Sequence, residues 1–340
     1  MKKDSNCCDL IRVDFFRGLR SIVKKELENY QEVCIVRETD ESFYIKYFSS
    51  YNRLRLLKSV LRVYLISEDK NYTPKYVARH KSLLGNIVER VLSESDDDFK
   101  TFKIVCAGSD SPEVRSIADY VRERFGLVES DRADLKLYMI KPSDVWQVGV
   151  EITSRPLSLR NYKVMNMDGA MDPTVAYAVN SLVNINSQGR YLNVFSGSGT
   201  LLIEAIMAFG SVAEFIGFDN NKKHLSLAIK NIKKAGLIKK VKLYERDILN
   251  MPYDPGKFDS ITADMPFGMS VSKGEDLNLL YERFIEFCQS SLKEKGTLVA
   301  YTNQVALFEA VVSKSEFRVT KKIEIRYHAY LKPCIFVCKL

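Results

Sequence analysis

The sequence predicts an α/β protein with a doubly wound, mostly parallel sheet in its C-terminal half and two small α+β domains before it. From residue 172 onward, helical periods alternate regularly with short apolar runs, which is the pattern that crossover helices between parallel strands produce. Before residue 160, strand-like and helical stretches follow no such alternation. With 340 residues, the chain is also longer than one hydrophobic core usually organises.

The C-terminal half contains five apolar runs that suit buried strands, with helical periods between them. An antiparallel hairpin is expected at the end of the sheet. The expected strands are residues 191–195, 214–218, 241–244, 258–263 and 297–302, the helices are 201–209, 222–235 and 277–293, and the hairpin joins 318–327 to 335–339.

The N-terminal part divides into two units. In the first, strand-like runs at 9–16, 33–36 and 43–48 flank a helical period at 19–30, and apolar spacing predicts an amphipathic helix over 51–63. In the second, Pro112 predicts the start of a helix that ends at Gly126, between strands at 102–106, 135–139 and 145–152. The expected domains are 1–66, 67–160 and 161–340, with 161–190 as linker and leading helix.

The composition is that of a soluble globular protein, with 46% hydrophobic and 28% charged residues. No apolar run approaches the roughly 20 residues that span a bilayer, and the polar N-terminus lacks the apolar core of a signal peptide. We therefore expect a cytoplasmic protein without a membrane partner. The seven cysteines are scattered and the three histidines widely separated, which predicts reduced thiols and no metal site. No oligomeric partner is indicated.

Part of the net charge of +8 is concentrated between residues 51 and 90, where nine lysines and arginines stand against three acids and alternate with tyrosines. Basic side chains can neutralise phosphates and aromatic rings can stack on bases, so this stretch is a candidate RNA-binding surface. A solvated basic surface without a partner is the alternative. The expected RNA contacts are Arg53, Arg55, Lys58, Arg62, Lys75, Arg79 and Lys81, together with Arg160.

A glycine-rich stretch at residues 193–200 follows the first strand of the C-terminal half and opens a helix. Glycines let the backbone approach a ligand closely, and the helix N-terminus offers free N–H groups to an anion. Many tight strand-to-helix turns contain the same glycines, so the motif alone is ambiguous. The expected ligand contacts are Asn193, Phe195, Ser196, Gly197, Gly199 and Thr200.

Acidic residues follow the next two strands. Asp219 and Asn220 end the second strand about 20 residues after the glycines, where a carboxylate can accept both hydroxyls of a ribose. Asp247 and Ile248 follow the third strand, where the acid can bind an adenine amino group. This spacing suits NAD and S-adenosylmethionine (SAM) equally.

The turn formed by residues 264–268 (DMPFG) follows the fourth strand. A carboxylate there can accept a hydrogen bond from the exocyclic amino group of a base, while an aromatic ring stacks on the face of the base. A polar turn with a core phenylalanine is the alternative. We expect Asp264, Pro266 and Phe267 to form the catalytic group, helped by the Met265 carbonyl, with Asp264 also lining the cofactor site.

Taken in order, the motifs FSGSGT, FDNN, RDI and DMPFG resemble those of the amino-methyltransferases. Residues 155–162 (RPLSLRNY), 172–176 (DPTVA) and 195–205 (FSGSGTLLIEA) are similar to the THUMP-domain RNA guanine-N2 methyltransferases, particularly those that act on the tRNA acceptor stem. The resemblance covers nearly the whole chain.

This resemblance implies SAM as cofactor, a Rossmann-like catalytic domain, and N-terminal ferredoxin-like and THUMP domains that grip tRNA. It also implies methylation of the N2 amino group of a guanosine in the acceptor stem, at position 6. The sequence departs from the family at Asn193, Val194 and Ser196, where an acid, a proline and a cysteine are usual. Asn193 lacks the negative charge that attracts the SAM ammonium group.

Several alternatives stay open. A D/N-x-P-[Y/F] turn serves adenine-N6 methyltransferases equally well, and rRNA can take the place of tRNA. A non-catalytic THUMP RNA-binding module is opposed by the intact Gly197, Asp219 and Phe267, and a nicotinamide enzyme is opposed by the DMPFG turn. Methylation of cytosine C5 is disfavoured because it needs a cysteine nucleophile near the turn, and Cys288 is expected on the following helix.

Overall fold

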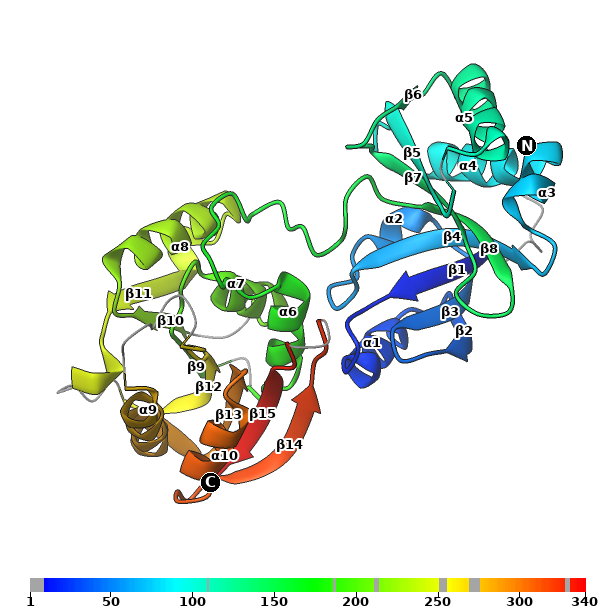
Figure 1. The fold of residues 1–340 in the computed structure, drawn as a ribbon. Coiled ribbons are helices and arrows are strands. Elements are labelled where there is room, and N and C mark those ends of the chain that lie inside the picture. Colours follow the sequence, from blue (N-terminus) through cyan, green and yellow to red (C-terminus); the bar gives the residue numbers. More distant parts are fainter. Residues whose placement is uncertain are drawn as a thin grey trace. The chain divides into compact units, whose positions relative to one another are not determined.

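The computed structural model describes residues 9–108, 110–185, 188–210, 214–250, 256–268, 276–327 and 331–340 (Figure 1). The chain forms two compact units. The first contains the described residues up to Phe15 together with Val23–Ser158, and the second contains Phe16–Ile22 together with Leu159–Leu340. We call them the N-terminal unit and the methyltransferase-like unit. The short segment Phe16–Ile22 therefore belongs to a unit that otherwise begins at residue 159.

One eight-stranded sheet runs through the N-terminal unit, in the order β2-β3-β1-β4-β8-β7-β5-β6. Its strands are β1 (Asp9–Asp14), β2 (Val33–Glu38), β3 (Ser42–Tyr47), β4 (Arg62–Asp69), β5 (Thr101–Cys106), β6 (Val128–Glu129), β7 (Leu135–Ile140) and β8 (Trp146–Glu151). The helices are α1 (Arg20–Leu27), α2 (Tyr51–Leu54), α3 (Pro74–Arg79), α4 (Ser82–Glu94) and α5 (Pro112–Phe125).

The two expected N-terminal domains share this sheet, because β4 pairs with β1 on one side and with β8 on the other. The expected boundary at residue 66 lies inside β4. Where α5 begins and ends agrees with the prediction: the Ser111 hydroxyl accepts from the Val114 N–H, and Gly126 ends the helix in the left-handed conformation.

The amphipathic helix expected over residues 51–63 is wrong, since α2 covers only Tyr51–Leu54 and β4 begins at Arg62. Leu54, Leu57 and Val60 are buried as expected, whereas Leu56 is 60% exposed. The chain leaves the helix because the Glu26 carboxylate accepts from the backbone N–H groups of Lys58, at 2.6 Å, and Ser59, at 2.9 Å. These bonds replace the intrahelical ones, so tertiary contacts override the local period.

The methyltransferase-like unit has a seven-stranded sheet in the order β11-β10-β9-β12-β13-β15-β14. The strands are β9 (Arg190–Val194), β10 (Glu214–Asp219), β11 (Val241–Glu245), β12 (Phe258–Asp264), β13 (Leu292–Thr302), β14 (Arg318–Glu324) and β15 (Cys334–Lys339). All neighbours pair in parallel except β15, which is antiparallel to both β13 and β14. This confirms the predicted doubly wound sheet with its terminal antiparallel hairpin.

Helices cover both faces of the seven-stranded sheet, with α6, α7 and α8 on one face and α9 and α10 on the other (Figure 1). They are α6 (Pro173–Ser181), α7 (Thr200–Ala208), α8 (Lys222–Lys234), α9 (Leu277–Ser291) and α10 (Val305–Val312). The strand order reverses between β9 and β12, so the carboxyl ends of these two strands mark the switch point where such sheets bind ligands.

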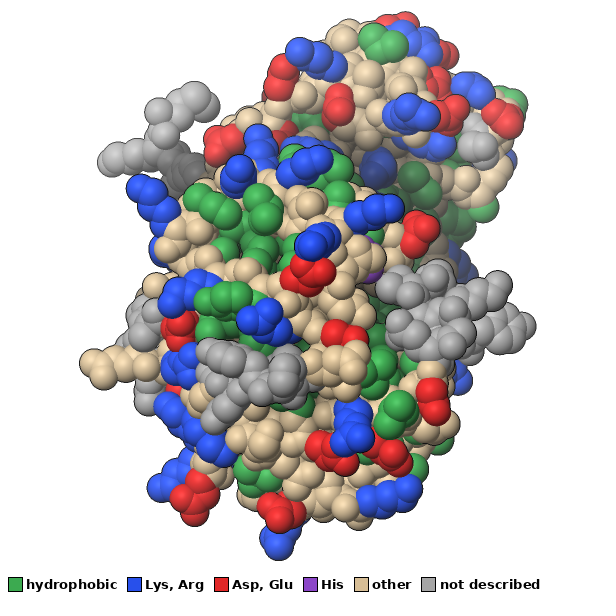
Figure 2. Space-filling view, turned by 90° about the vertical axis from the view of Figure 1, so that its left-hand side faces the viewer, with side chains coloured by type: hydrophobic (Ala, Val, Ile, Leu, Met, Phe, Trp, Pro, Cys, Tyr) green, Lys and Arg blue, Asp and Glu red, His purple; other side chains and the backbone are tan. Residues whose placement is uncertain are grey.

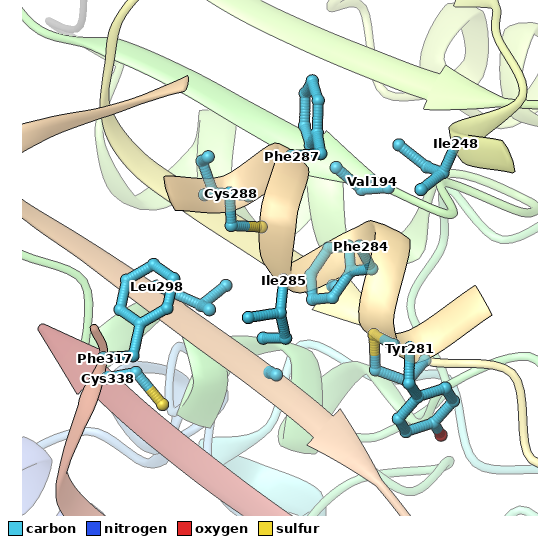
Figure 3. Close-up of a cluster of buried hydrophobic side chains, with 14 of the residues drawn as sticks. Val194, Ile248, Tyr281, Phe284, Ile285, Phe287, Cys288, Leu298, Phe317 and Cys338 are labelled. Atoms are coloured by element: carbon cyan, nitrogen blue, oxygen red, sulfur yellow. The ribbon is translucent and has the colours of Figure 1, made fainter. Parts of the chain in front are cut away.

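The largest core cluster of this unit lies between α9, α10 and the sheet. Figure 3 shows this cluster. Successive turns of α9 contribute Tyr281, Phe284, Ile285 and Cys288, whose side chains lie beside the strands. All four are at most 2% exposed. Burial of this kind is worth about 25 cal/mol per Å² of apolar surface, so the core fixes the sheet edge from which the β12 turn projects. Cys288 lies on α9, as predicted.

Within the described ranges, the structure contains no helix that combines the length and the apolar character needed to cross a membrane. It also contains no group of three or more His, Cys, Asp or Glu side chains arranged to hold a metal ion.

Candidate functional site

A pocket opens at the carboxyl edge of the seven-stranded sheet. It is formed by the residues that follow β9, β10 and β12 and by the loop before α6. Nine of the residues expected at the cofactor site line it: Phe195, Ser196, Gly197, Thr200, Asp219, Asn220, Asp247, Ile248 and Asp264. The turn residues Pro266 and Phe267 line it too. The sequence motifs therefore meet in one cavity.

The glycine-rich loop is held in a conformation that ordinary side chains resist. Gly199 has a φ of 83°, and a Cβ atom added to it would lie 3.1 Å from the Ala228 Cβ of α8. Phe195 also lies in the left-handed region, with a φ of 57°, which costs of order 1 to 3 kcal/mol for a non-glycine residue. Gly199 does not line the pocket, so its role is to let α7 and α8 pack closely.

Helix α7 begins at the pocket with polar groups that have no partner. Its N-cap is Gly199, which provides no side-chain hydrogen bond to the first turn. The Thr200 hydroxyl is buried and has no hydrogen-bond partner in the part of the chain that the structure describes, although Thr200 lines the cavity. Free N–H groups at a helix start and an unpaired hydroxyl together can bind a carboxylate.

Asp219, at the end of β10, accepts hydrogen bonds from the glycine loop and from the start of α8. The Gly197 N–H donates to Oδ2 at 2.8 Å and the Asn221 N–H to Oδ1 at 2.9 Å. The His224 Nδ1 lies 3.3 Å from the same Oδ1. A carboxylate has about four acceptor positions, so Asp219 can still accept from a ligand while it fixes the loop.

His224 lines the pocket, which the sequence did not indicate, because a histidine in the first turn of a lysine-rich helix reads as a surface or capping residue. The loop 167–171 before α6 also lines the cavity and was missed. Asp247 is at the pocket as expected, and its carboxylate accepts from the Leu249 N–H at 3.1 Å. It thereby holds the short 3₁₀ turn Ile248–Asn250.

Three backbone groups of the turn after β12 are held by hydrogen bonds. The Met265 N–H donates to the Tyr301 carbonyl at 2.9 Å. The Tyr281 hydroxyl donates to the Pro266 carbonyl at 2.9 Å, and the Gln304 Nε2 donates to the Phe267 carbonyl at 2.7 Å. Since the Phe267 ring also packs against Tyr301, with centroids 5.8 Å apart, the turn is rigid before any ligand binds.

Asp264 is the exception in this turn, because its carboxylate accepts no hydrogen bond from the described residues. Burial disfavours the charged form and raises the pKa of Asp264 to about 7, while the positive charge of Lys163 acts in the opposite direction. Lys163 is half-buried, which lowers its pKa, and its ammonium group donates to the Met171 carbonyl at 3.1 Å. The pocket thus contains a carboxylate, that of Asp264, which can accept a hydrogen bond and receives none from the described residues.

Asn193 is a correction to the expected cofactor set. It is fully buried and does not line the pocket. Its Nδ2 lies 3.3 Å from the Thr262 carbonyl of the neighbouring strand, and its Oδ1 has no partner. β9 is a central strand between β10 and β12, and every residue from Tyr191 to Val194 is buried, so a side chain before the end of the strand lies in the protein interior whichever face it is on.

Arg160 is a correction to the expected RNA contacts. Its side chain is only 8% exposed and forms an ion pair with the buried Glu204 at 2.9 Å. The Tyr162 hydroxyl donates to the same carboxylate oxygen at 2.8 Å. The positive charge of Arg160 therefore compensates the buried carboxylate of Glu204 and is not presented at the surface.

The other expected RNA contacts differ in their ion pairing and in their exposure. Arg53 pairs with Glu32, Arg55 with Asp97 and Arg62 with Glu151. Lys75 and Arg79 are exposed on α3, whereas the Lys81 ammonium lies 6.0 Å from the Tyr120 ring centroid and Lys58 is half-buried. Figure 2 shows blue and red side chains interleaved over one face of the molecule.

Of the tyrosines in this stretch, Tyr51 and Tyr64 are buried and cannot stack on a base. Tyr72 and Tyr76 stack on each other at 5.8 Å, and His80 continues the row at 4.3 Å from Tyr76. Tyr76 is exposed, so the accessible aromatic surface of residues 51–90 lies on α3 and directly before it.

A doubly wound seven-stranded sheet with an antiparallel last strand, a glycine loop after β9 and an acidic turn after β12 together define a Rossmann-like methyltransferase fold. The model of the RMKL-like methyltransferase domain family matches residues 160–332, and the chain belongs to this family. The resemblance seen in the sequence is therefore confirmed for the methyltransferase domain.

Among curated proteins, the chain is similar to a tRNA (guanine(6)-N2)-methyltransferase of Thermus thermophilus, with 27% identity over 58% of this chain and 59% of the relative. It is also similar to the bovine U6 snRNA (guanine-N(2))-methyltransferase THUMPD2, with 26% identity over 65% of this chain and 44% of the relative. The chain thus spans about half the length of these relatives.

Two solved structures have the same fold. TrmN from Thermus thermophilus aligns with a TM-score of 0.77 at 20% identity, covering 97% of this chain and 99% of that one. SMU.472, complexed with SAH, aligns with a TM-score of 0.73 at 16% identity, covering 99% and 98%.

Proposed function

We propose that this protein is an enzyme that transfers a methyl group from SAM to the N2 amino group of a guanosine in structured RNA, with tRNA as its substrate. The observation that carries the proposal is the carboxylate of Asp264, which accepts no hydrogen bond from the described residues and lies in the same pocket as the glycine loop. An amino group of a base is the donor that such an acceptor lacks.

The pocket fits SAM group by group. The start of α7, with the unpaired Thr200 hydroxyl, suits the carboxylate of the amino-acid part. Asp219 has acceptor capacity left for a ribose hydroxyl, and Asp247 with Ile248 stands where the adenine is expected. Phe195, Ser196, Gly197 and Asn220 complete the expected contacts. Because Asn193 is buried, the ammonium group has no partner at that position.

In the proposed reaction, protein residues hold the base, stabilise the developing positive charge and take up the proton. SAM supplies an electrophilic methyl group, and the guanine amine is a poor nucleophile because its lone pair is delocalised. Phe267 stacks on the base and holds the amine in line with the methyl group, within roughly 3 to 3.5 Å. Asp264 would then accept the N–H as the N–C bond forms, the bond from the methyl carbon to the SAM sulfur breaks and positive charge develops on the nitrogen. It would take the proton from the methylated amine, and S-adenosylhomocysteine would leave.

The RNA class follows from the relatives, whose names include tRNA and U6 snRNA guanine-N2 methyltransferases. We favour tRNA, with guanosine 6 of the acceptor stem as the target and the cytoplasm as the compartment. The N-terminal unit is the part that we expect to hold the RNA. Lys75 and Arg79 are its exposed cations on α3, next to Tyr72 and Tyr76, and Arg53, Arg55, Lys58, Arg62 and Lys81 are secondary contacts.

The test is methyl transfer from labelled SAM to unmodified tRNA transcripts by the full chain, followed by mass spectrometry of the nucleosides. We expect N2-methylguanosine, and its loss when guanosine 6 is replaced by adenosine. N6-methyladenosine as the product would assign the adenine alternative. SAM binding without transfer to tRNA, rRNA or U6 snRNA would favour the non-catalytic module, and tight NAD binding without SAM binding would refute the proposal.

A further inference from the structure

The segment Phe16–Ile22 belongs to the methyltransferase-like unit although it lies between β1 and α1 in the sequence. Its backbone forms an isolated antiparallel bridge between Arg17 and Arg326, in which the Arg326 N–H donates to the Arg17 carbonyl at 3.1 Å. The bridge lies just beyond the end of β14. The edge of the sheet near the pocket is therefore completed by residues from far earlier in the chain.

Gly18 allows this close approach. Its φ is 103°, and a Cβ atom added to it would lie 1.9 Å from the Glu324 carbonyl oxygen. Both the backbone conformation and the missing side chain are thus required at this position. Any larger residue at position 18 would push the segment away from the end of β14 and break the neighbouring bridge between Arg17 and Arg326.

Phe16 connects this segment to the turn that contains Asp264. Its ring packs on Tyr327 with centroids 4.5 Å apart, and the hydroxyls of Tyr327 and Tyr301 are 3.3 Å apart. The Tyr301 ring packs against Phe267, and its carbonyl accepts from the Met265 N–H. Each contact in this row fixes the next, and the row ends on the residues expected to hold the base.

The two tyrosines also face the charged groups of the pocket. Burial raises the pKa of Tyr301 and of Tyr327, and the negative charges of Asp264 and Asp172 raise both further. Both hydroxyls therefore stay protonated at neutral pH. One of the pair donates to the other, so the position of Tyr327 determines how the Tyr301 hydroxyl is satisfied.

We propose that Phe16 and Gly18 are positioning residues for methyl transfer, which hold Tyr327 against Tyr301 and so fix the turn Asp264–Phe267 for the incoming base. This inference rests on the proposed function. It assigns no contact with RNA or SAM to either residue, and it predicts that the C-terminal half alone, without residues 16–22, has an incomplete base-binding side.

The experiment compares full-length variants in single-turnover methyl transfer, SAM calorimetry and thermal unfolding. Phe16→Ala should lower the transfer rate roughly 10- to 100-fold, as expected for a misplaced reacting group, with SAM affinity unchanged. Phe16→Leu should restore most of the rate. Gly18→Ala should be impaired, whereas Gly236→Ala should not, since Gly236 has a similar positive φ but no atom within 4 Å of an added Cβ.

A double-mutant cycle decides whether Phe16 acts through Tyr327. If it does, Phe16→Ala adds little to the loss already caused by Tyr327→Ala. Additive losses, a rate of Phe16→Ala within twofold of the wild type, or a parallel loss of SAM affinity would each overturn the inference. A wild-type chain that methylates no RNA would instead overturn the proposed function, and this inference with it.

Discussion

The carboxylates on the two sides of the pocket differ in the hydrogen bonds that they accept within the protein. On the side of the pocket that we propose binds the cofactor (the cofactor wall), Asp219 already accepts from Gly197 and Asn221 and lies beside His224. On the side that we propose binds the base (the base wall), Asp264 accepts no hydrogen bond from the described residues, and burial raises its pKa to about 7. The cofactor wall is thus a finished network that a ligand joins, whereas the base wall holds one group whose partner must come with the substrate.

This difference predicts that the residues around Asp219 serve cofactor binding and that Asp264 serves the chemical step. A carboxylate bonded to its own loop gains little from a further ligand contact, but it keeps the loop in the shape that binds the cofactor. Asp264 is partly buried, and desolvation disfavours its charged form in the free protein. That cost is relieved when an amino group with developing positive charge approaches. Substitutions on the two walls should therefore affect different measured quantities.

The largest effect is expected for Asp264→Ala. Removal of one pre-positioned electrostatic group of this kind typically lowers kcat by about 10² to 10³. SAM affinity should change little, because the cofactor wall is intact. Single-turnover transfer to unmodified tRNA and SAM calorimetry measure the two quantities separately, and near wild-type turnover would remove Asp264 from the mechanism.

Asp219→Ala should give the opposite pattern. It removes the acceptor for the Gly197 and Asn221 N–H groups as well as a ribose contact, and hydrogen bonds to charged groups are worth about 1.5 to 3 kcal/mol. The Kd for SAM should rise roughly 10- to 100-fold with RNA affinity unchanged. Asp259→Ala is the matched control, since Asp259 pairs with Lys293 and does not line the pocket. Equal losses in both variants would mean that the effect is one of stability.

Phe267→Ala tests whether the ring aligns the base as well as holding it. Loss of base–aromatic stacking costs roughly 1 to 3 kcal/mol, and we expect it to be divided between kcat and KM for RNA. Phe209→Ala, at a partly buried phenylalanine outside the pocket, is the control. A change in KM alone would restrict Phe267 to binding.

The smallest effect is the pH dependence of kcat/KM, which reports ionisations of the free enzyme. Asp264 must be ionised to accept a proton, and with a pKa of about 7 it is mostly protonated at pH 6. The rate should therefore rise roughly tenfold between pH 6 and pH 8 and then level off. Asp264→Asn, which cannot titrate, should show a flat profile at a lower rate; the same rise in this variant would assign the ionisation elsewhere.

The methyltransferase half could be predicted because its signals are local. Apolar runs of strand length, glycines after β9 and acids after β10, β11 and β12 each report on one strand end, and topology brings parallel strand ends together. What could not be predicted depends on distant partners: Glu26 ends the helix at α2, and Glu204 draws Arg160 inward. No local pattern identifies these partners.

The same reasoning explains the remaining misses in the site. His224 lies in the pocket only because Asp219 turns toward the start of α8, and the loop 167–171 has neither period nor motif. Asn193 stands at a family position whose acid it lacks, and its burial depends on β9 being a central strand between β10 and β12, which the sequence of β9 alone does not show.

The bridge between Arg17 and Arg326 also has a consequence for the order of events during synthesis. Ribosomes add roughly 5 to 20 residues per second, so Phe16 and Gly18 emerge on the order of tens of seconds before the strand they pair with. During that interval a large aromatic ring has no native neighbour at Tyr327. Contacts of such long sequence separation form slowly, and this bridge cannot form before the chain has been synthesised as far as Tyr327.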